Sequence, residues 1–157
     1  MFLFSLANKL FHFGLIVCLL FLVNCGGDII AESGQLQSPN YPSIYPNSQV
    51  CTWTITAPIG FSVGLNFETF DVRIEKYLSF KWALLLNISL IFQTESCCDF
   101  VEIRDGGDES STKLSRFSGG TKPNDIKSTG NQLFVRFRSD SSVQRRGFSA
   151  SFTKGRK

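Results

Sequence analysis

The side chains that could do chemistry in this chain are acidic residues and cysteines, because histidine is almost absent. The only histidine, His12, lies in an apolar N-terminal stretch that we expect to be removed. Without it the chain lacks the base of Ser–His and Cys–His nucleophiles and the histidines of the zinc-protease motif. Residues 147–151 read Gly-Phe-Ser-Ala-Ser, which only approaches the Gly-x-Ser-x-Gly motif. Carboxylates and thiols therefore carry the candidate chemistry.

Two carboxylates, Glu95 and Asp99, lie close enough in sequence to be considered as a catalytic pair of the glycosidase kind. A chain of 157 residues without a second element to form a cleft disfavours that activity. The formal charge is only +3, and no basic face carries interleaved aromatic residues, which argues against nucleic-acid binding. The residues therefore argue against an enzyme.

The N-terminal residues 1–24 have the pattern of a secretory signal peptide. Lys9 and His12 precede residues 13–23, which contain no charge. This run suits the apolar region of a signal and is too short to span a bilayer. We expect a secreted, extracellular protein without a membrane span in its mature form, folded in an oxidising compartment. An uncleaved membrane anchor is the alternative.

Alternation of apolar and polar residues with a period of two predicts β-strands along the rest of the chain. Turn residues such as Pro58-Ile59-Gly60 and Gly130-Asn131 separate the strands, and no helical pattern remains after residue 24 outside residues 72–93. Many short strands, each with one buried face, predict a two-sheet sandwich. The alternating runs are residues 52–56, 61–67, 101–104, 133–138 and 148–153.

Two blocks of residues resemble the CUB module of extracellular proteins, over about residues 25–153. The resemblance implies an all-β fold, a two-sheet antiparallel jelly-roll-like β-sandwich, and a role in binding other molecules. The first block is Ser38-Pro39-Asn40-Tyr41-Pro42 with Tyr45-Pro46 and Cys51-Thr52-Trp53; the second is Ser139-Asp140-Ser141-Ser142 with Gly147-Phe148-Ser149-Ala150.

The resemblance also implies a disulfide between Cys25 and Cys51, which have the spacing of the first CUB bridge. Many CUB modules have a second bridge, but Ser118 occupies one of its positions here. Cys97 and Cys98 therefore lack partners within the domain, and adjacent cysteines rarely bond each other. They are either free thiols or crosslinks between two chains.

Calcium binding is the site chemistry that the resemblance implies, with Glu95, Asp99 and Asp140 as metal ligands. Glu68 and Asp71 are substitutes for Glu95, and the carbonyls near Ser142 could complete the six to eight oxygens that Ca²⁺ takes. Tyr41 and Ser142 are candidate binding residues at the same end, although Tyr41 could equally be a buried structural residue. The plain alternative is that the three acids are solvated surface side chains.

The partner that the resemblance implies is an extracellular protein or glycan that presents a basic group to the calcium end. A second hypothesis is a structural or matrix component, crosslinked through Cys97 or Cys98 and holding an acidic matrix through a basic tail at residues 154–157. A third is that the chain is a fragment of a larger multi-module protein.

Residues 72–93 interrupt a strand-turn-strand unit that runs continuously in related modules. Their removal joins Asp71 to Thr94, and the product fits the family pattern without a gap. Val72-Arg73 can be encoded by a splice donor, and Phe92-Gln93 by an acceptor. We interpret the segment as a retained intron, which transcript sequencing tests. A real apolar insertion and a membrane segment are the alternatives, although Lys81 leaves the apolar run too short to span.

Overall fold

The computed structural model describes residues 25–73 and 99–156. The expected signal peptide, residues 74–93 of the expected insertion, Glu95, Cys97 and Cys98 lie outside the described residues.

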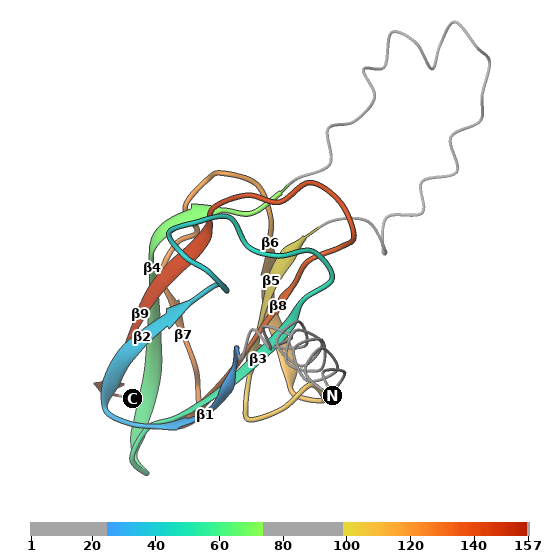
Figure 1. Ribbon diagram of the computed structural model, residues 1–157. Helices are drawn as coiled ribbons and strands as arrows, with labels where there is room; N and C mark the ends of the chain where they lie inside the picture. The colour runs from blue at the N-terminus through green and yellow to red at the C-terminus, as the bar shows by residue number, and fades with distance from the viewer. Residues whose placement is uncertain (1–24, 74–98, 157) are drawn as a thin grey trace, which may run out of the picture.

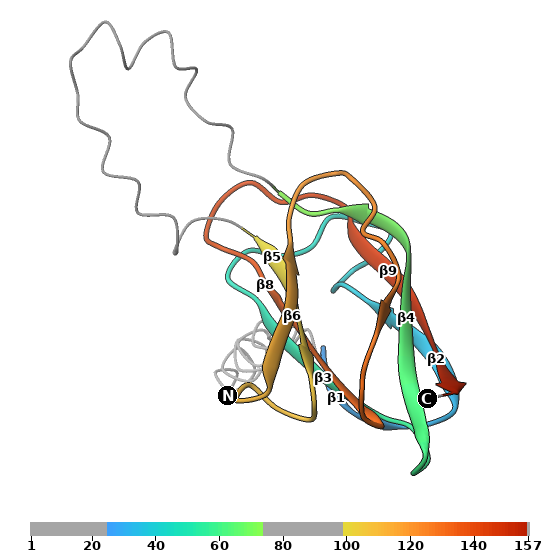
Figure 2. The ribbon, with the colours of Figure 1, turned by 180° about the vertical axis from the view of Figure 1, so that it is seen from behind.

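Two β-sheets pack face to face, as Figures 1 and 2 show from opposite sides. All neighbouring strands are antiparallel except β1 and β3, which run parallel. The five-stranded sheet has the order β1 (Gly27–Ile30), β3 (Val50–Thr56), β8 (Gln132–Arg138), β5 (Phe100–Asp105), β6 (Thr112–Phe117). The four-stranded sheet has the order β2 (Ser33–Gln37), β9 (Gly147–Arg156), β4 (Phe61–Asp71), β7 (Ile126–Lys127).

The alternating strands place their apolar side chains between the sheets, as their sequences predict. Trp53 and Ile55 of β3 pair with Val135 and Leu133 of β8, and all four side chains are buried. Phe148 of β9 lies at the centre of the core, with ring centroids 5.8 Å from Phe67 and 5.8 Å from Phe137 in edge-to-face arrangements. Edge-to-face aromatic pairs stabilise a core beyond the apolar area they bury. The expected all-β sandwich is therefore confirmed.

The five expected strands are all present, and the described residues contain no helix, hence none that could cross a membrane. Strands β1, β2, β6 and β7 were not predicted, because they are short or partly exposed and lack a regular apolar alternation. Lys154, Gly155 and Arg156, expected to form a tail, instead extend β9 and pair with Val63, Ser62 and Phe61 of β4. The domain thus extends past residue 153, because the backbone of β4 offers these residues hydrogen-bonding partners.

The first two residues of the 72–93 segment are part of the sandwich. The Val72 side chain is only 1% exposed. Its backbone N–H donates to the Gly119 carbonyl at 2.9 Å, and its carbonyl accepts from the Gly119 N–H at 2.5 Å. Val72 therefore anchors the chain directly after β4 and fixes the position of the Arg73 backbone.

The expected disulfide is present: Cys25 is bonded to Cys51, 26 residues further along the chain. Cys51 is fully buried in β3, so the bridge ties the start of the described chain to the core of the five-stranded sheet.

Candidate cation-binding loop end

Three segments distant in sequence meet at one end of the sandwich (Figure 1): the β2–β3 loop, the β8–β9 loop, and the end of β4 with the start of β5. Backbone bonds join the two loops, from Ser48 N–H to the Asp140 carbonyl at 2.6 Å and from Ser139 N–H to the Gln49 carbonyl at 2.9 Å. We call this region, residues 45–49, 71–73, 99 and 139–142, the loop end. These backbone bonds hold its polar side chains in fixed positions.

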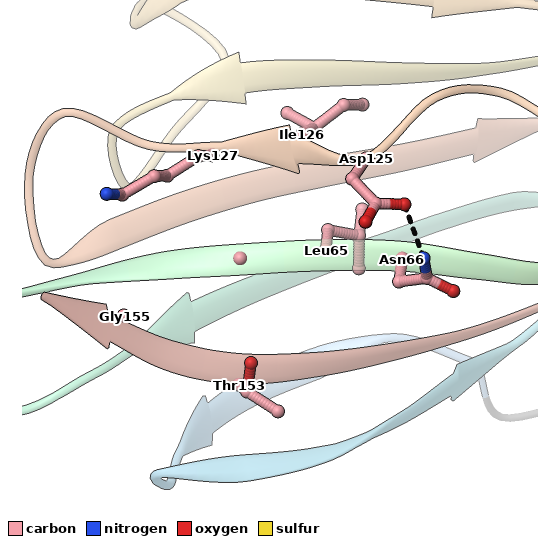
Figure 3. A pocket seen from close by; sticks show the side chains of 8 residues that line it. Leu65, Asn66, Asp125, Ile126, Lys127, Thr153 and Gly155 are labelled. Atoms are coloured by element: carbon pink, nitrogen blue, oxygen red, sulfur yellow. Dashed lines mark hydrogen bonds between the residues drawn. The ribbon is translucent and has the colours of Figure 1, made fainter.

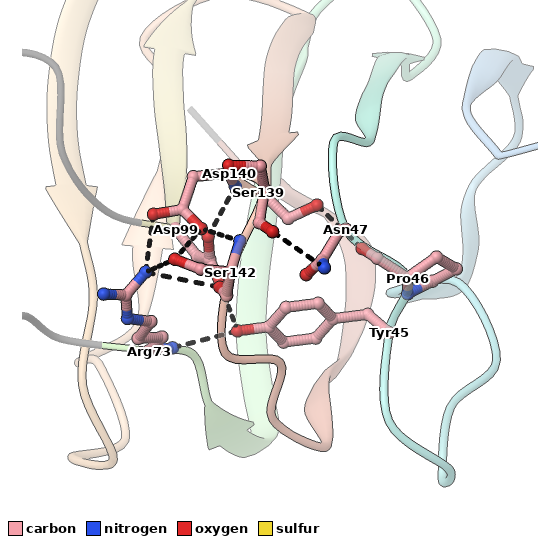
Figure 4. A network of polar contacts seen from close by, with 9 residues as sticks. Tyr45, Pro46, Asn47, Arg73, Asp99, Ser139, Asp140 and Ser142 are labelled. Carbon is pink, nitrogen blue, oxygen red and sulfur yellow. Dashed lines mark hydrogen bonds and ion pairs between the residues drawn. The ribbon is translucent and has the colours of Figure 1, made fainter.

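Asp99 is the buried acid of the loop end, with no exposed surface. Its Oδ2 accepts from the Tyr45 hydroxyl at 2.5 Å, and its Oδ1 accepts from the Asp140 backbone N–H at 2.7 Å. A buried polar group without partners would cost several kcal/mol, so these two donors make the position of Asp99 tolerable. Asp99 thereby connects β5 to both loops (Figure 4).

Asp140 is the second acid, and it pairs with a cation that sequence reasoning did not identify. Its Oδ1 accepts from the Ser142 N–H at 2.7 Å, and its Oδ2 lies 2.5 Å from Arg73 Nη1. The same Nη1 donates to Ser142 Oγ at 2.9 Å and to the Ser142 carbonyl at 3.3 Å (Figure 4). One carboxylate, one hydroxyl and one carbonyl oxygen therefore surround a single cationic nitrogen.

Tyr45 is the second residue of the loop end that sequence reasoning passed over. It is fully buried, donates to Asp99, and accepts from the Arg73 backbone N–H at 3.1 Å. Burial raises the pKa of Tyr45 well above its usual range, and the hydrogen bond to Asp99 raises this pKa further. Its position in the Tyr45-Pro46 pair was noted only as part of a family motif, which says nothing of its contacts.

Of the other candidate site residues, only some lie beside Asp99 and Asp140. Ser142 lies in the cluster. Tyr41 is half-buried and accepts from Thr69 Oγ1 at 2.9 Å, which ties it to β4 and not to the two acids. Glu68 is exposed, and its Oε2 accepts from Ser149 Oγ at 3.3 Å. Asp71 lies near Tyr45 and contributes slightly to its raised pKa. The structure thus brings Asp99, Asp140 and Ser142 together.

The oxygens around Arg73 Nη1 are of the kinds that Ca²⁺ prefers, but the residues present do not fit a calcium ion. Ca²⁺ takes six to eight oxygens, and here the guanidinium already uses those of Asp140 and Ser142. Within the described ranges, 25–73 and 99–156, no group of three or more His, Cys, Asp or Glu side chains could hold a metal. Among the described residues, the guanidinium of Arg73 occupies the oxygens of Asp140 and Ser142.

A shallow pocket lies away from the loop end, between β4, β7 and β9 (Figure 3). Its polar side chains include Asp125, which accepts from Asn66, and Lys127, whose ammonium donates to the Arg156 carbonyl at 2.7 Å. Both charged groups are already engaged within the domain. The pocket therefore supplies no free charged group for a second candidate site.

The fold and its loop end define a β-sandwich module in which a polar end is held together by contacts between loops. Residues 25–152 match the CUB domain family, so this chain belongs to that family. It is similar to tolloid-like protein 2 of Mus musculus, 44% identical over 131 residues, which covers 83% of this chain and 11% of that protein. It is 45% identical to a bone morphogenetic protein 1 homolog of Strongylocentrotus purpuratus, covering 83% of this chain and 18% of that one.

Solved structures show the same fold. The MASP-1 CUB2 domain bound to Ca²⁺ superposes with a TM-score of 0.63 at 28% identity, covering 83% of this chain and 99% of that one. The extracellular region of zebrafish Gpr126/Adgrg6 superposes with a TM-score of 0.65 at 31% identity, covering 85% of this chain and 15% of that one. CUB domains are generally non-catalytic interaction modules. The chain spans less than a fifth of the length of the curated relatives named above.

Proposed function

We propose that this chain is a secreted, non-catalytic binding protein whose CUB module contacts an extracellular protein, or a glycan, through the loop end. The observation that carries the proposal is that Asp99, at the start of β5, accepts from the Asp140 N–H of the β8–β9 loop, while the Asp140 carboxylate pairs with Arg73 after β4. Backbone hydrogen bonds hold the two loops in fixed positions there, which lowers the entropy cost of binding a partner.

Calcium enters this proposal for the form of the chain without residues 72–93. In that form Thr94 and Glu95 follow Asp71 directly, so that by count Glu95 takes the place of Arg73. A carboxylate there would face Asp140 and repel it, and a divalent cation would relieve the repulsion. Glu95, Asp99 and Asp140 would then hold Ca²⁺, with the ion neutralising the acids and fixing the loops for a partner's Lys or Arg.

The test is a thermal melt of the chain lacking residues 72–93, in millimolar CaCl₂ and in chelator. We expect Ca²⁺ to raise Tm by several degrees, because a ligand that binds only the folded state stabilises it. Asp140→Ala should abolish this rise. Asp28→Ala, which removes an exposed acid of β1, is the matched control and should keep it. A well-folded chain whose Tm ignores Ca²⁺ would refute the calcium site.

The hypothesis that the chain is a fragment of a multi-module protein is compatible with the small share of each relative that it covers. A CUB module within a longer chain would use the same loop end, so the melt tests the calcium site in either case.

A further inference from the structure

We infer that Arg73 is a built-in counter-cation which replaces a metal ion at the loop end, so that the chain containing Val72 and Arg73 is indifferent to Ca²⁺. This inference deepens the proposed function, because it rests on the loop end being a cation site. Whether Ca²⁺ stabilises the module then depends on one residue, Arg73.

The guanidinium of Arg73 contacts the same oxygens that a bound metal ion would need. Nη1 binds Asp140 Oδ2, Ser142 Oγ and the Ser142 carbonyl at 2.5, 2.9 and 3.3 Å. The side chains of Arg73 and Asp140 are 17% and 26% exposed, so the ion pair is mostly shielded from water. Shielding strengthens the attraction and makes loss of either partner costly.

Backbone contacts hold Arg73 beside Asp140. Val72 is buried and pairs with Gly119 through two hydrogen bonds, and the Arg73 N–H donates to Tyr45 Oη. Tyr45 in turn donates to Asp99. The backbone is therefore held on the N-terminal side of the Arg73 Cα before the side chain makes any contact, which reduces the entropy lost on pairing.

Occupation by Arg73 and by Ca²⁺ is mutually exclusive for two reasons. The ion needs the Asp140 and Ser142 oxygens that Nη1 uses, because it must gather at least six oxygens. A displaced guanidinium would remain tethered close to the ion and repel it. The positive charge of Arg73 thus lowers calcium affinity even when its hydrogen bonds are broken.

The experiment compares Tm in CaCl₂ and in chelator, at matched ionic strength, for the full chain and three variants. The Tm of the unchanged chain should differ by less than about 1 °C between CaCl₂ and chelator, since the Arg73 side chain already supplies the cation. Arg73→Gln should melt lower in chelator, and Ca²⁺ should restore part of the loss. Arg73→Glu should melt lowest in chelator and gain several degrees in Ca²⁺, because it adds a third carboxylate.

Arg104→Gln is the matched control, because Arg104 forms a similarly shielded ion pair, with Glu102 at 2.7 Å, away from the loop end. This variant should lose stability without gaining a response to Ca²⁺. A full chain that gains as much from Ca²⁺ as Arg73→Glu overturns the inference, as does a set in which neither Arg73 variant responds. If Arg73→Glu responds but the chain lacking residues 72–93 does not, the inference stands and the assignment of Glu95 fails.

Discussion

The Tyr45 hydroxyl donates to the Asp99 carboxylate at 2.5 Å, linking residues 54 positions apart in the sequence. Both residues are fully buried, and the same tyrosine oxygen accepts the backbone N–H of Arg73. This one phenol therefore joins the β2–β3 loop, the start of β5 and the end of β4.

Replacing Tyr45 by Phe should lower the free energy of unfolding by about 1–3 kcal/mol, because a buried carboxylate and a backbone N–H each lose a partner. Urea unfolding measures this loss. Tyr41→Phe is the matched control: its half-buried hydroxyl only accepts from Thr69, and it should cost about 0.5 kcal/mol or less. Equal losses of unfolding free energy in the two variants would contradict a stabilising role for the Tyr45 hydroxyl bonds to Asp99 and Arg73.

Alkaline pH should destabilise the domain through the same tyrosine. The folded-state pKa of Tyr45 is raised above its unfolded value of about 10, so its contribution is fully present below pH 10. Above pH 10 the unfolded chain loses this proton and the folded chain keeps it, so stability falls by up to about 1.4 kcal/mol per pH unit. The difference in unfolding free energy between the unchanged chain and Tyr45→Phe should therefore stay constant from pH 8 to about 10 and shrink between pH 10 and 11.5.

Gly147→Ala should be among the most damaging single changes. Gly147 has φ +83°, and an added Cβ would lie 1.8 Å from Ser38 Oγ. Ser38 cannot move aside freely, because its Oγ accepts from the Phe148 N–H and its N–H donates to the Phe148 carbonyl. Backbone strain and overpacking together should cost about 2–4 kcal/mol by urea unfolding. Gly120→Ala, where nothing lies within 4 Å, is the control and should be nearly neutral.

Removal of the Cys25–Cys51 bridge by replacing both cysteines with Ala should cost about 3–4 kcal/mol, from the loop-closure entropy of its 26-residue separation. The double variant avoids leaving one thiol to pair with Cys97 or Cys98. Its stability should not change further on adding a reductant, whereas the unchanged chain should fall to the same level. If a reductant does not lower the stability of the unchanged chain, this result would argue against the bridge.

Cys97 and Cys98 distinguish the binding protein from the crosslinked matrix component. On a non-reducing gel we expect a monomer. A covalent dimer that disappears when both residues are replaced by Ala would favour the matrix hypothesis instead.

The 72–93 segment shows where sequence reasoning reached its limit. The segment was recognised as foreign to the family pattern, yet its first residues, Val72 and Arg73, take up positions in the sandwich. Sequence comparison treats an insertion as a block, whereas backbone pairing continues as long as a partner such as Gly119 is available. Whether residues 72–93 are an intron stays a prediction for transcript sequencing.

The sequence by itself determined the all-β class, the five long strands, the Cys25–Cys51 pairing and the candidacy of Asp99 and Asp140. The fold class and the strands follow from local alternation, whereas the disulfide pairing and the two acids are implied by the resemblance of short motifs to the CUB family. Only the tertiary structure decided that Tyr45 binds Asp99 and that Arg73 lies among the oxygens of Asp140 and Ser142. The physical reason is that packing the two sheets decides which loops share an end, and contacts between residues 54 and 67 positions apart leave no local pattern.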